Sequence, residues 1–294
     1  MSEQDRYIAG VPCWVDTAQP DPKAAAEFYG GLFGWEFEDV MPAGSPVPYL
    51  MARLPGGDVG AIAGQPPGTA GPAAWNTYVW VQDADETAAK VRAAGGSVQM
   101  DPDAASDAGR MAVFADPEGA AFSVWEPRRH RGAAVVNEPG SVNFNDLSVR
   151  DVAAARAFYG AVFGWETLDL GGGQMWTLPG YGDFLERRTP GMRANMAQMG
   201  APERFEDVVA SLVAIPADQA DTPAHWGVTF AVADADATAA RAAELGGRIL
   251  AAPFDAPWVR MAVIADPQGA TFTANQFVPE NKDLAADASA GAAA

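Results

Sequence analysis

Cysteine, histidine and positive charge are scarce in this sequence of 294 residues. The single cysteine, Cys13, excludes an intrachain disulfide, and only two histidines are present to supply imidazole ligands to a transition metal. The 19 Lys and Arg residues stand against 38 Asp and Glu, so the net charge is −19, which repels nucleic-acid phosphates and anionic lipid headgroups. We therefore expect no nucleic-acid partner and no membrane partner.

The chain also lacks a hydrophobic run of the roughly 18 to 20 residues that a membrane helix needs. Its first residues have neither the basic region nor the apolar stretch of a secretory signal, so a cytoplasmic location is expected. Hydrophobic residues make up 49% of the chain, which is typical of folded domains, and the length favours two of them.

An internal repeat divides the chain. The stretch FYGGLFGWE at 28–36 returns as FYGAVFGWE at 158–166, and RMAVFADPEG at 110–119 returns as RMAVIADPQG at 260–269. The offset grows from 158 − 28 = 130 to 260 − 110 = 150, so the second copy carries a net 20 additional residues between these motifs. The repeat predicts two domains, over residues 8–127 and 139–279, with an exposed linker over 128–138 and a flexible tail over 280–294.

Local motifs predict the same elements in both copies. Asp21 followed by Pro22 favours a helix start, since Asp caps free backbone N–H groups and Pro needs no hydrogen bond there; Asp151 is the counterpart. Asp83 opens a second helix, and the sequence DPEG at 116–119 fits a type I turn between two strands. Short β-type segments lie between, so each copy is predicted to be an α+β domain of two βαβββ modules.

These paired motifs resemble the vicinal oxygen chelate superfamily, which includes glyoxalase I, bleomycin-resistance proteins and extradiol dioxygenases. The resemblance covers nearly the whole chain. It implies two tandem glyoxalase/bleomycin-resistance-like domains, each a pair of βαβββ modules that form a cup-shaped sheet around a small-molecule site. It also implies positions for a divalent metal on the first and last strands of each module.

Those metal positions hold poor ligands in this sequence. The first-strand position, seven residues before the helix-opening Asp, is Trp14 in one copy and Phe144 in the other. The second-module position is Asn76 or Gly227, and the last-strand position is Ser123 or Thr273. The remaining strand end, expected at 61–65 and 195–199, carries no carboxylate. A metal site needs about three or four converging ligands, so we predict that no metal or other cofactor is bound, with a divalent metal as the disfavoured alternative.

Three residues are candidates for acid–base chemistry: Asp16, Asp146 and His225. Each Asp shares a strand face with an aromatic residue, and a carboxylate in an apolar pocket acquires a raised pKa. Asp also accepts backbone hydrogen bonds at strand ends, and this structural role is an open alternative for both. His225 is the only histidine expected near a cup, because His130 falls in the predicted solvated linker.

Aromatic and small polar residues are candidates for lining the cups, although core packing is an alternative for aromatic rings. The candidate substrate-binding residues are Trp14, Tyr49, Trp75, Asn76, Tyr78, Ser123, Trp125, Phe144, Trp176, Trp226 and Trp258. Arg110 and Arg260 recur in both copies, where each either anchors an anionic ligand or, as we favour, pairs with a nearby carboxylate.

Two functions from different classes remain open. The first is metal-independent binding of a hydrophobic or aromatic small molecule, as in bleomycin-resistance proteins. The second is a glyoxalase-like or hydroxylase-like enzyme, with lyase, isomerase or oxygenase chemistry, that uses a carboxylate or His base; a metalloenzyme is less favoured. One or both cups are expected to be functional; if only one is, the longer loops of the second copy favour the second cup. The chain is expected as a monomer or homodimer.

Overall fold

The computed structural model describes residues 6–65, 68, 73–105, 107–170 and 173–284. The first copy folds into eight strands and two helices: β1 (Pro12–Gln19), α1 (Pro22–Phe33), β2 (Glu36–Asp39), β3 (Tyr49–Leu54), β4 (Gly57–Gly64), β5 (Ala74–Trp80), α2 (Ala84–Ala93), β6 (Ser97–Ala105), β7 (Gly109–Ala115) and β8 (Ala121–Pro127).

The second copy repeats this order and adds short helices between its third and fourth strands. Its elements are β9 (Val142–Val149), α3 (Val152–Phe163), β10 (Glu166–Asp169), β11 (Gln174–Thr177), α4 (Tyr181–Arg188), α5 (Met192–Met199), η1 (Phe205–Asp207), β12 (Val208–Ala214), β13 (His225–Ala231), α6 (Ala235–Glu244), β14 (Arg248–Ala256), β15 (Val259–Ala265), β16 (Thr271–Phe277) and η2 (Pro279–Asp283).

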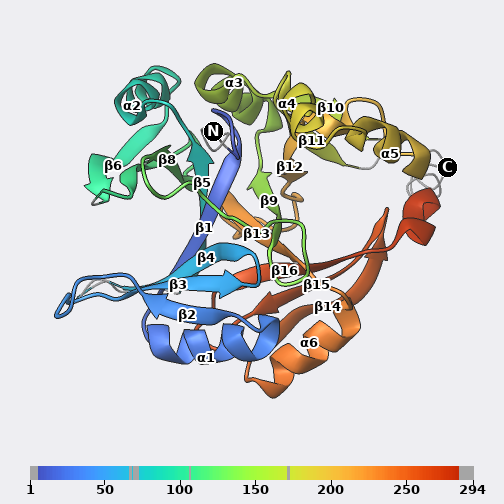
Figure 1. Ribbon diagram of the computed structural model, residues 1–294. Coiled ribbons are helices and arrows are strands. Elements are labelled where there is room, and N and C mark those ends of the chain that lie inside the picture. The colour runs from blue at the N-terminus through green and yellow to red at the C-terminus, as the bar shows by residue number, and fades with distance from the viewer. Residues whose placement is uncertain (1–5, 66–67, 69–72, 106, 171–172, 285–294) are drawn as a thin grey trace.

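Each copy forms its own eight-stranded mixed sheet. The strand orders are β2-β3-β4-β1-β5-β8-β7-β6 and β10-β11-β12-β9-β13-β16-β15-β14, so the two sheets have the same topology. In both, the two βαβββ modules join through their first strands, β1 with β5 and β9 with β13. Figure 1 shows the sheets on opposite sides of the molecule, and β5 and β13 pack together between them. The predicted α+β fold of two tandem domains is confirmed.

The helix starts follow the expected capping. The side chain of Asp21 accepts hydrogen bonds from the backbone N–H groups of Lys23 and Ala24, and Asp151 accepts one from Ala154. Asp83 and Asp234 cap α2 and α6 in the same way. None of the helices in the described ranges has the length and hydropathy that crossing a membrane requires.

The first helix of each copy packs on the opposite domain. Helix α1 lies against α6 of the second domain, and α3 lies against α2 of the first (Figure 1). Trp35 Nε1 donates to the carbonyl of Gly140 at 2.7 Å, and Trp165 Nε1 donates to the carbonyl of Gly10 at the same distance. The repeated motif at 28–36 and 158–166 is therefore the core of the domain interface.

Three boundary expectations are corrected. The segment after β8 is only partly exposed, because the N–H of Ala133 donates to the carbonyl of Cys13 at 2.8 Å and Ala133 is buried, whereas Arg128, Arg129 and Arg131 are exposed. The tail does not begin at residue 280, since η2 is ordered there by Asn281; residues 285–294 lie outside the described part. Residues 195–199 form part of α5, and the strand expected there is β12.

Candidate functional site

A carboxylate marks the floor of each sheet's concave face, buried in the first domain and half-buried in the second. We name these faces the first cup, around Asp16 on β1, and the second cup, around Asp146 on β9. Asp16 accepts hydrogen bonds from Tyr78 at 2.8 Å, Asn76 at 2.9 Å and Tyr49 at 3.0 Å. Burial raises the pKa of Asp16, and these three donors oppose the shift. Its hydrogen-bonding capacity is largely used by its own domain.

Aromatic side chains fill the rest of the first cup. Trp14 Nε1 donates to the Tyr49 hydroxyl at 3.0 Å, and the ring of His130 lies edge-on to Trp14 with centroids 4.4 Å apart. His130 also packs against Trp125, whose Nε1 donates to the His130 carbonyl. Ser123 completes the group through a hydrogen bond with Tyr78. His130 therefore closes the first cup, and the expectation of a solvated linker residue is wrong.

The second cup has smaller side chains around its carboxylate. Asp146 accepts hydrogen bonds from Ser211 at 2.5 Å and Thr229 at 2.6 Å. Burial raises the pKa of Asp146, while the two hydroxyl groups and the nearby charge of His225 oppose the shift. The strand registers match Thr229 with Tyr78 of the first cup and Gly227 with Asn76. Fewer protein groups therefore compete for Asp146.

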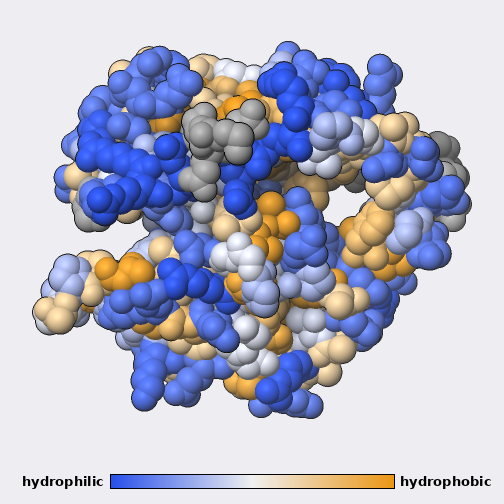
Figure 2. All heavy atoms as spheres, viewed as in Figure 1, coloured by the Kyte–Doolittle hydropathy of each residue, from blue (hydrophilic) through white to orange (hydrophobic). Residues whose placement is uncertain are grey.

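Exposed hydrophobic side chains line the second cup. Val213 on β12 is 46% exposed, Phe254 on β14 is 42% exposed and Phe277 on β16 is 56% exposed. Val213 lies two residues after Ser211 on β12, so the two side chains share the concave face. Phe254 pairs with Met261 and Met261 pairs with Asn275, two residues before Phe277, so Phe254 and Phe277 lie on the same face. Figure 2 shows a hollow on each side of the molecule, and hydrophobic residues border the one on the right, beside β14 and β15.

The first cup has no such wall at the matching positions. By strand register, Val213, Phe254 and Phe277 of the second cup correspond to Ala63, Asp103 and Pro127 of the first, in that order. Large exposed hydrophobic patches on a soluble protein mark binding surfaces more often than chance placement does. The second cup therefore differs from the first in the hydrophobic character of its walls as well as in the size of the side chains around its carboxylate.

An unusual tryptophan stands at the mouth of the second cup. Trp258 has a φ of 69°, a conformation that bulky residues rarely adopt, and its ring stacks on Phe277 with centroids 6.3 Å apart. Gly200, which ends α5, lies beside Trp258. His225 is exposed at the start of β13, on the face of Gly227 and Thr229, and its Nδ1 contacts the Pro223 carbonyl. The additional helix α5 thus borders this cup.

Three of the expected ligand-contacting residues lie elsewhere. Trp75 and Trp226 are buried at the domain interface, where their Nε1 atoms donate to the hydroxyls of Tyr29 and Tyr159. Trp176 is fully buried against Tyr159. The expectation that these three line the cups is corrected: each alternates onto the helix-covered face of its sheet. Phe144 lies on the cup face of β9, next to Asp146 and opposite Thr229.

The residues of neither cup fit a metal ion. No group of three or more His, Cys, Asp or Glu close enough to share a metal occurs among the residues that the structure describes. The carboxylate on the floor of each cup, Asp16 or Asp146, already accepts hydrogen bonds from neighbouring side chains, and Asp103 on β6 of the first cup is exposed. The usual protein metal sites need more anionic or imidazole ligands than this.

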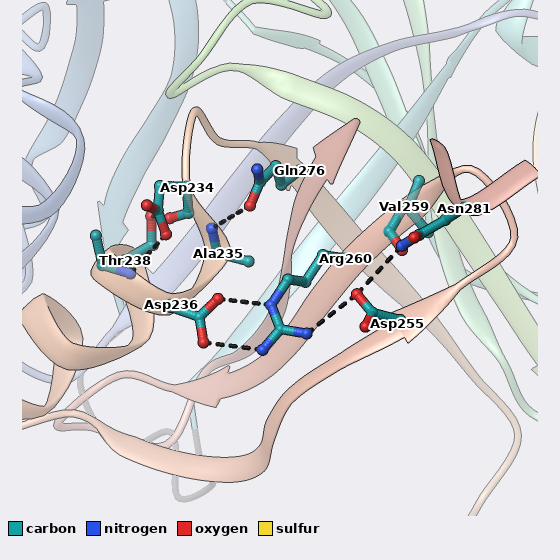
Figure 3. Close-up of polar contacts among 10 residues, drawn as sticks. Asp234, Ala235, Asp236, Thr238, Asp255, Val259, Arg260, Gln276 and Asn281 are labelled. Carbon is teal, nitrogen blue, oxygen red and sulfur yellow. Dashed lines mark hydrogen bonds and ion pairs between the residues drawn. The ribbon is translucent and has the colours of Figure 1, made fainter. Parts of the chain in front are cut away.

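The repeated arginines face away from the cups. Figure 3 shows Arg260 between Asp236, at the start of α6, and Asp255 on β14, with nitrogen–oxygen distances of 2.9 Å and 3.0 Å. Arg110 pairs with Asp85 and Glu126 in the first domain. The favoured expectation that these arginines form carboxylate pairs is confirmed.

Sequence reasoning missed several residues of the second cup, and they fall into two groups. Ser211 and Thr229 contact Asp146, but nothing in their local sequence sets them apart from other strand residues. Phe254 and Phe277 differ from their first-copy counterparts. Aligning the two copies position by position, with the additional helices left out, would identify them.

Comparison with known proteins supports this reading of the fold. The sequence matches the Glyoxalase/Bleomycin resistance protein/Dioxygenase superfamily over residues 14–124 and 140–273. It is 39% identical over 286 residues to the putative glyoxylase CFP32 of Mycobacterium tuberculosis, covering 95% of this chain and all of that protein. It is 37% identical over 289 residues to the anthracycline biosynthesis protein DnrV of Streptomyces peucetius, covering 91% of this chain and 94% of DnrV.

A solved structure shares the fold at low sequence identity. The Mn(II)-bound glyoxalase of Novosphingobium aromaticivorans superposes with a TM-score of 0.57 and 15% identity, covering 91% of this chain and 82% of that one. This similarity concerns the fold alone, and the fold accommodates a metal in that protein. With both halves matched and two relatives aligned along nearly their whole length, the chain belongs to the Glyoxalase/Bleomycin resistance protein/Dioxygenase superfamily.

Proposed function

We propose that this protein binds a hydrophobic, aromatic small molecule in the second cup and that binding needs no metal ion. The observation that carries the proposal is the set of exposed hydrophobic side chains, Val213, Phe254 and Phe277, on the concave face that also holds Asp146. A site of this composition, with apolar walls and a few polar groups, is typical of small-molecule binding sites.

The polar floor supplies orientation. Because burial raises the pKa of Asp146, its carboxyl group keeps its proton to a higher pH than an exposed Asp does. A protonated carboxyl group donates a hydrogen bond to a ligand carbonyl, and an ionised one accepts a hydrogen bond from a ligand hydroxyl. In either protonation state, Asp146 therefore forms a hydrogen bond with a ligand that carries carbonyl or hydroxyl groups.

The name of one relative agrees with such a ligand. One relative is named as an anthracycline biosynthesis protein, and anthracyclines are flat, polycyclic aromatic compounds that carry carbonyl and hydroxyl groups. Flat rings of this kind stack well on Phe277 and Trp258 at the cup mouth. The proposal extends this ligand class to the present chain.

A binding titration tests the proposal. The probe is 2-hydroxyanthraquinone, followed by quenching of tryptophan fluorescence and by isothermal titration calorimetry, with and without EDTA. We expect one site per chain and an unchanged dissociation constant in EDTA. Phe254→Asp, which copies the first-cup residue Asp103, weakens binding by about tenfold because it removes an aromatic contact and adds a charge.

The matched control is Asp103→Phe in the first cup, which leaves the dissociation constant unchanged. Two sites per chain, or equal losses in both variants, would contradict the assignment to the second cup. Loss of binding in EDTA would show that a metal takes part.

Proton-transfer catalysis is the second candidate function, favoured by the burial of Asp146 and the neighbouring His225. In this reaction class the Asp146 carboxylate accepts a proton from one atom of a bound substrate and returns it to another, so that the substrate isomerises without a co-reactant. Exchange of ligand protons for deuterium in D₂O, followed by NMR, tests this: exchange that Asp146→Asn abolishes supports it, and binding without exchange rules it out.

A further inference from the structure

A buried amide oxygen in the second cup has no hydrogen-bond partner among the described residues. It is Oδ1 of Asn275 on β16, and Asn275 is only 9% exposed. Buried polar atoms are almost always hydrogen-bonded, since an unpaired one costs about 1 to 3 kcal/mol. An orphan acceptor beside an apolar cup therefore needs an explanation.

The other groups of the same amide are fixed. Asn275 Nδ2 donates to Asn143 Oδ1 at 2.6 Å, and Asn143 Nδ2 donates to Asn137 Oδ1 at 3.0 Å. Asn143 sits at the register shift of β9, where a bulge turns its side chain toward Asn275. The donations run from Asn275 through Asn143 to Asn137, so the Asn275 amide nitrogen is engaged and its oxygen is left as an acceptor.

The strand registers place Asn275 on the cup face. Thr273, two residues earlier, lies opposite Thr229, whose hydroxyl contacts Asp146. Asp146 on β9 lies opposite Gly227 and Asn275 on β16 lies opposite Ala231, so the two residues are about 13 Å apart along β13 and two strand spacings apart across it, or about 16 Å in all. This separation suits the two ends of a flat polycyclic molecule better than a single ring.

The first cup has no amide at the matching position, and its own buried atom without a partner among the described residues is Nε2 of His130. The residue that matches Asn275 is Trp125, whose indole N–H donates to the His130 carbonyl. The matching partner of Asn143 is Cys13. The amide chain therefore belongs to the cup that keeps its apolar wall exposed.

We infer that Asn275 Oδ1 accepts a hydrogen bond from a hydroxyl group of the ligand, so that the second cup selects hydroxylated aromatic molecules over their methyl ethers. The inference rests on the proposed function, because it concerns the same cup. The amide chain and Asp146 then hold opposite ends of the ligand, with Phe254 and Phe277 against its faces.

The test compares two ligands that differ only in the donor, 2-hydroxyanthraquinone and 2-methoxyanthraquinone. The unaltered protein should bind the hydroxyl compound about tenfold more tightly, since the ether leaves the amide oxygen unpaired. Asn275→Leu, which is close to Asn in size, should abolish the preference and keep the affinity for the ether. Asn76→Ala, which removes a half-buried amide from the first cup, should leave the preference intact.

The outcomes separate this inference from the proposed function. Equal affinity for both compounds, or a preference for the ether, would overturn the inference and leave aromatic binding in place. Failure of both compounds to bind would overturn both proposals. If Asn275→Leu does not fold, as judged by its thermal transition, Asn275→Ser replaces it, and the ligand comparison in the unaltered protein still decides the matter.

Discussion

The hydroxyl group of Tyr29 donates a hydrogen bond to Asp266 Oδ2 at 3.0 Å and so connects the first helix of one domain to the last hairpin turn of the other. Tyr159 repeats the contact with Asp116 at 3.2 Å in the opposite direction. Asp266 also accepts the amide of Gln19 and the backbone N–H of Ala270. The repeated DPxG turns therefore bind the neighbouring domain as well as shaping their own hairpins.

Tyr29→Phe should lower the free energy of unfolding by about 2 kcal/mol, because it removes the bond to Asp266 and leaves the Trp75 indole N–H without its acceptor. Asp266→Ala should cost about 3 kcal/mol, since several buried donors lose their acceptor. Urea denaturation measures both, with the exposed Asp218→Ala as control. Losses no larger than that of the control would show that the contact adds little to stability.

Asp146→Asn should change how stability depends on pH. Burial raises the folded-state pKa of Asp146 above its unfolded value, so the native state binds more protons and its stability falls as pH rises from about 4 through the raised pKa. The Asn variant lacks this loss. Its free energy of unfolding should therefore rise relative to that of the unaltered protein as pH increases over the same range. Denaturation at several pH values, with Asp218→Asn as control, checks the sign; a constant difference would refute it.

His130→Leu should have the opposite pH effect. Burial lowers the pKa of His130 in the folded state, opposed by the charge of Asp58, so the unfolded state binds more protons and the unaltered protein loses stability as pH falls below about 6.5. The variant should not show this loss. Its affinity for the aromatic probe should be unchanged, because His130 closes the first cup; altered affinity would place the ligand there instead.

Trp258→Gly should separate stability from binding. Glycine tolerates a positive φ that costs a bulky residue roughly 1 to 3 kcal/mol, and this relief offsets the lost stacking on Phe277. We expect a free energy of unfolding within about 1 kcal/mol of the original and binding about tenfold weaker. Arg204→Gly, which relieves a similar φ of 66°, is the control and should keep full affinity.

Much of the fold follows from local sequence. Asp21, Asp83 and their counterparts act as helix caps because capping depends on a few neighbouring atoms, and the turn at Asp116 follows the same logic. Periodicity alone does not show which sheet face meets the other domain. For this reason the sequence places Trp75 and Trp226 at a cup rim, although α1 and α3 of their own copies cover them.

The candidate site follows less completely. Asp16 and Asp146 stand out in the sequence because they recur beside aromatic residues, and both lie on the cup faces, Asp16 buried and Asp146 half-buried. Their environments differ through residues far away in sequence, such as Tyr49 in one cup and Ser211 in the other. The closure of the first cup by His130 depends on the path of the connecting segment, which no local pattern specifies.

The packing of α1 and α3 between their own sheet and the opposite domain has an evolutionary consequence. A half that folded alone would leave the faces of Tyr29 or Tyr159 uncovered, so each half needs a partner of the same shape. In a symmetric pair of identical subunits, every substitution alters both cups at once. Covalent linkage of the halves lets a substitution act on one cup only, so that one half can specialise as support while the other retains an open cavity.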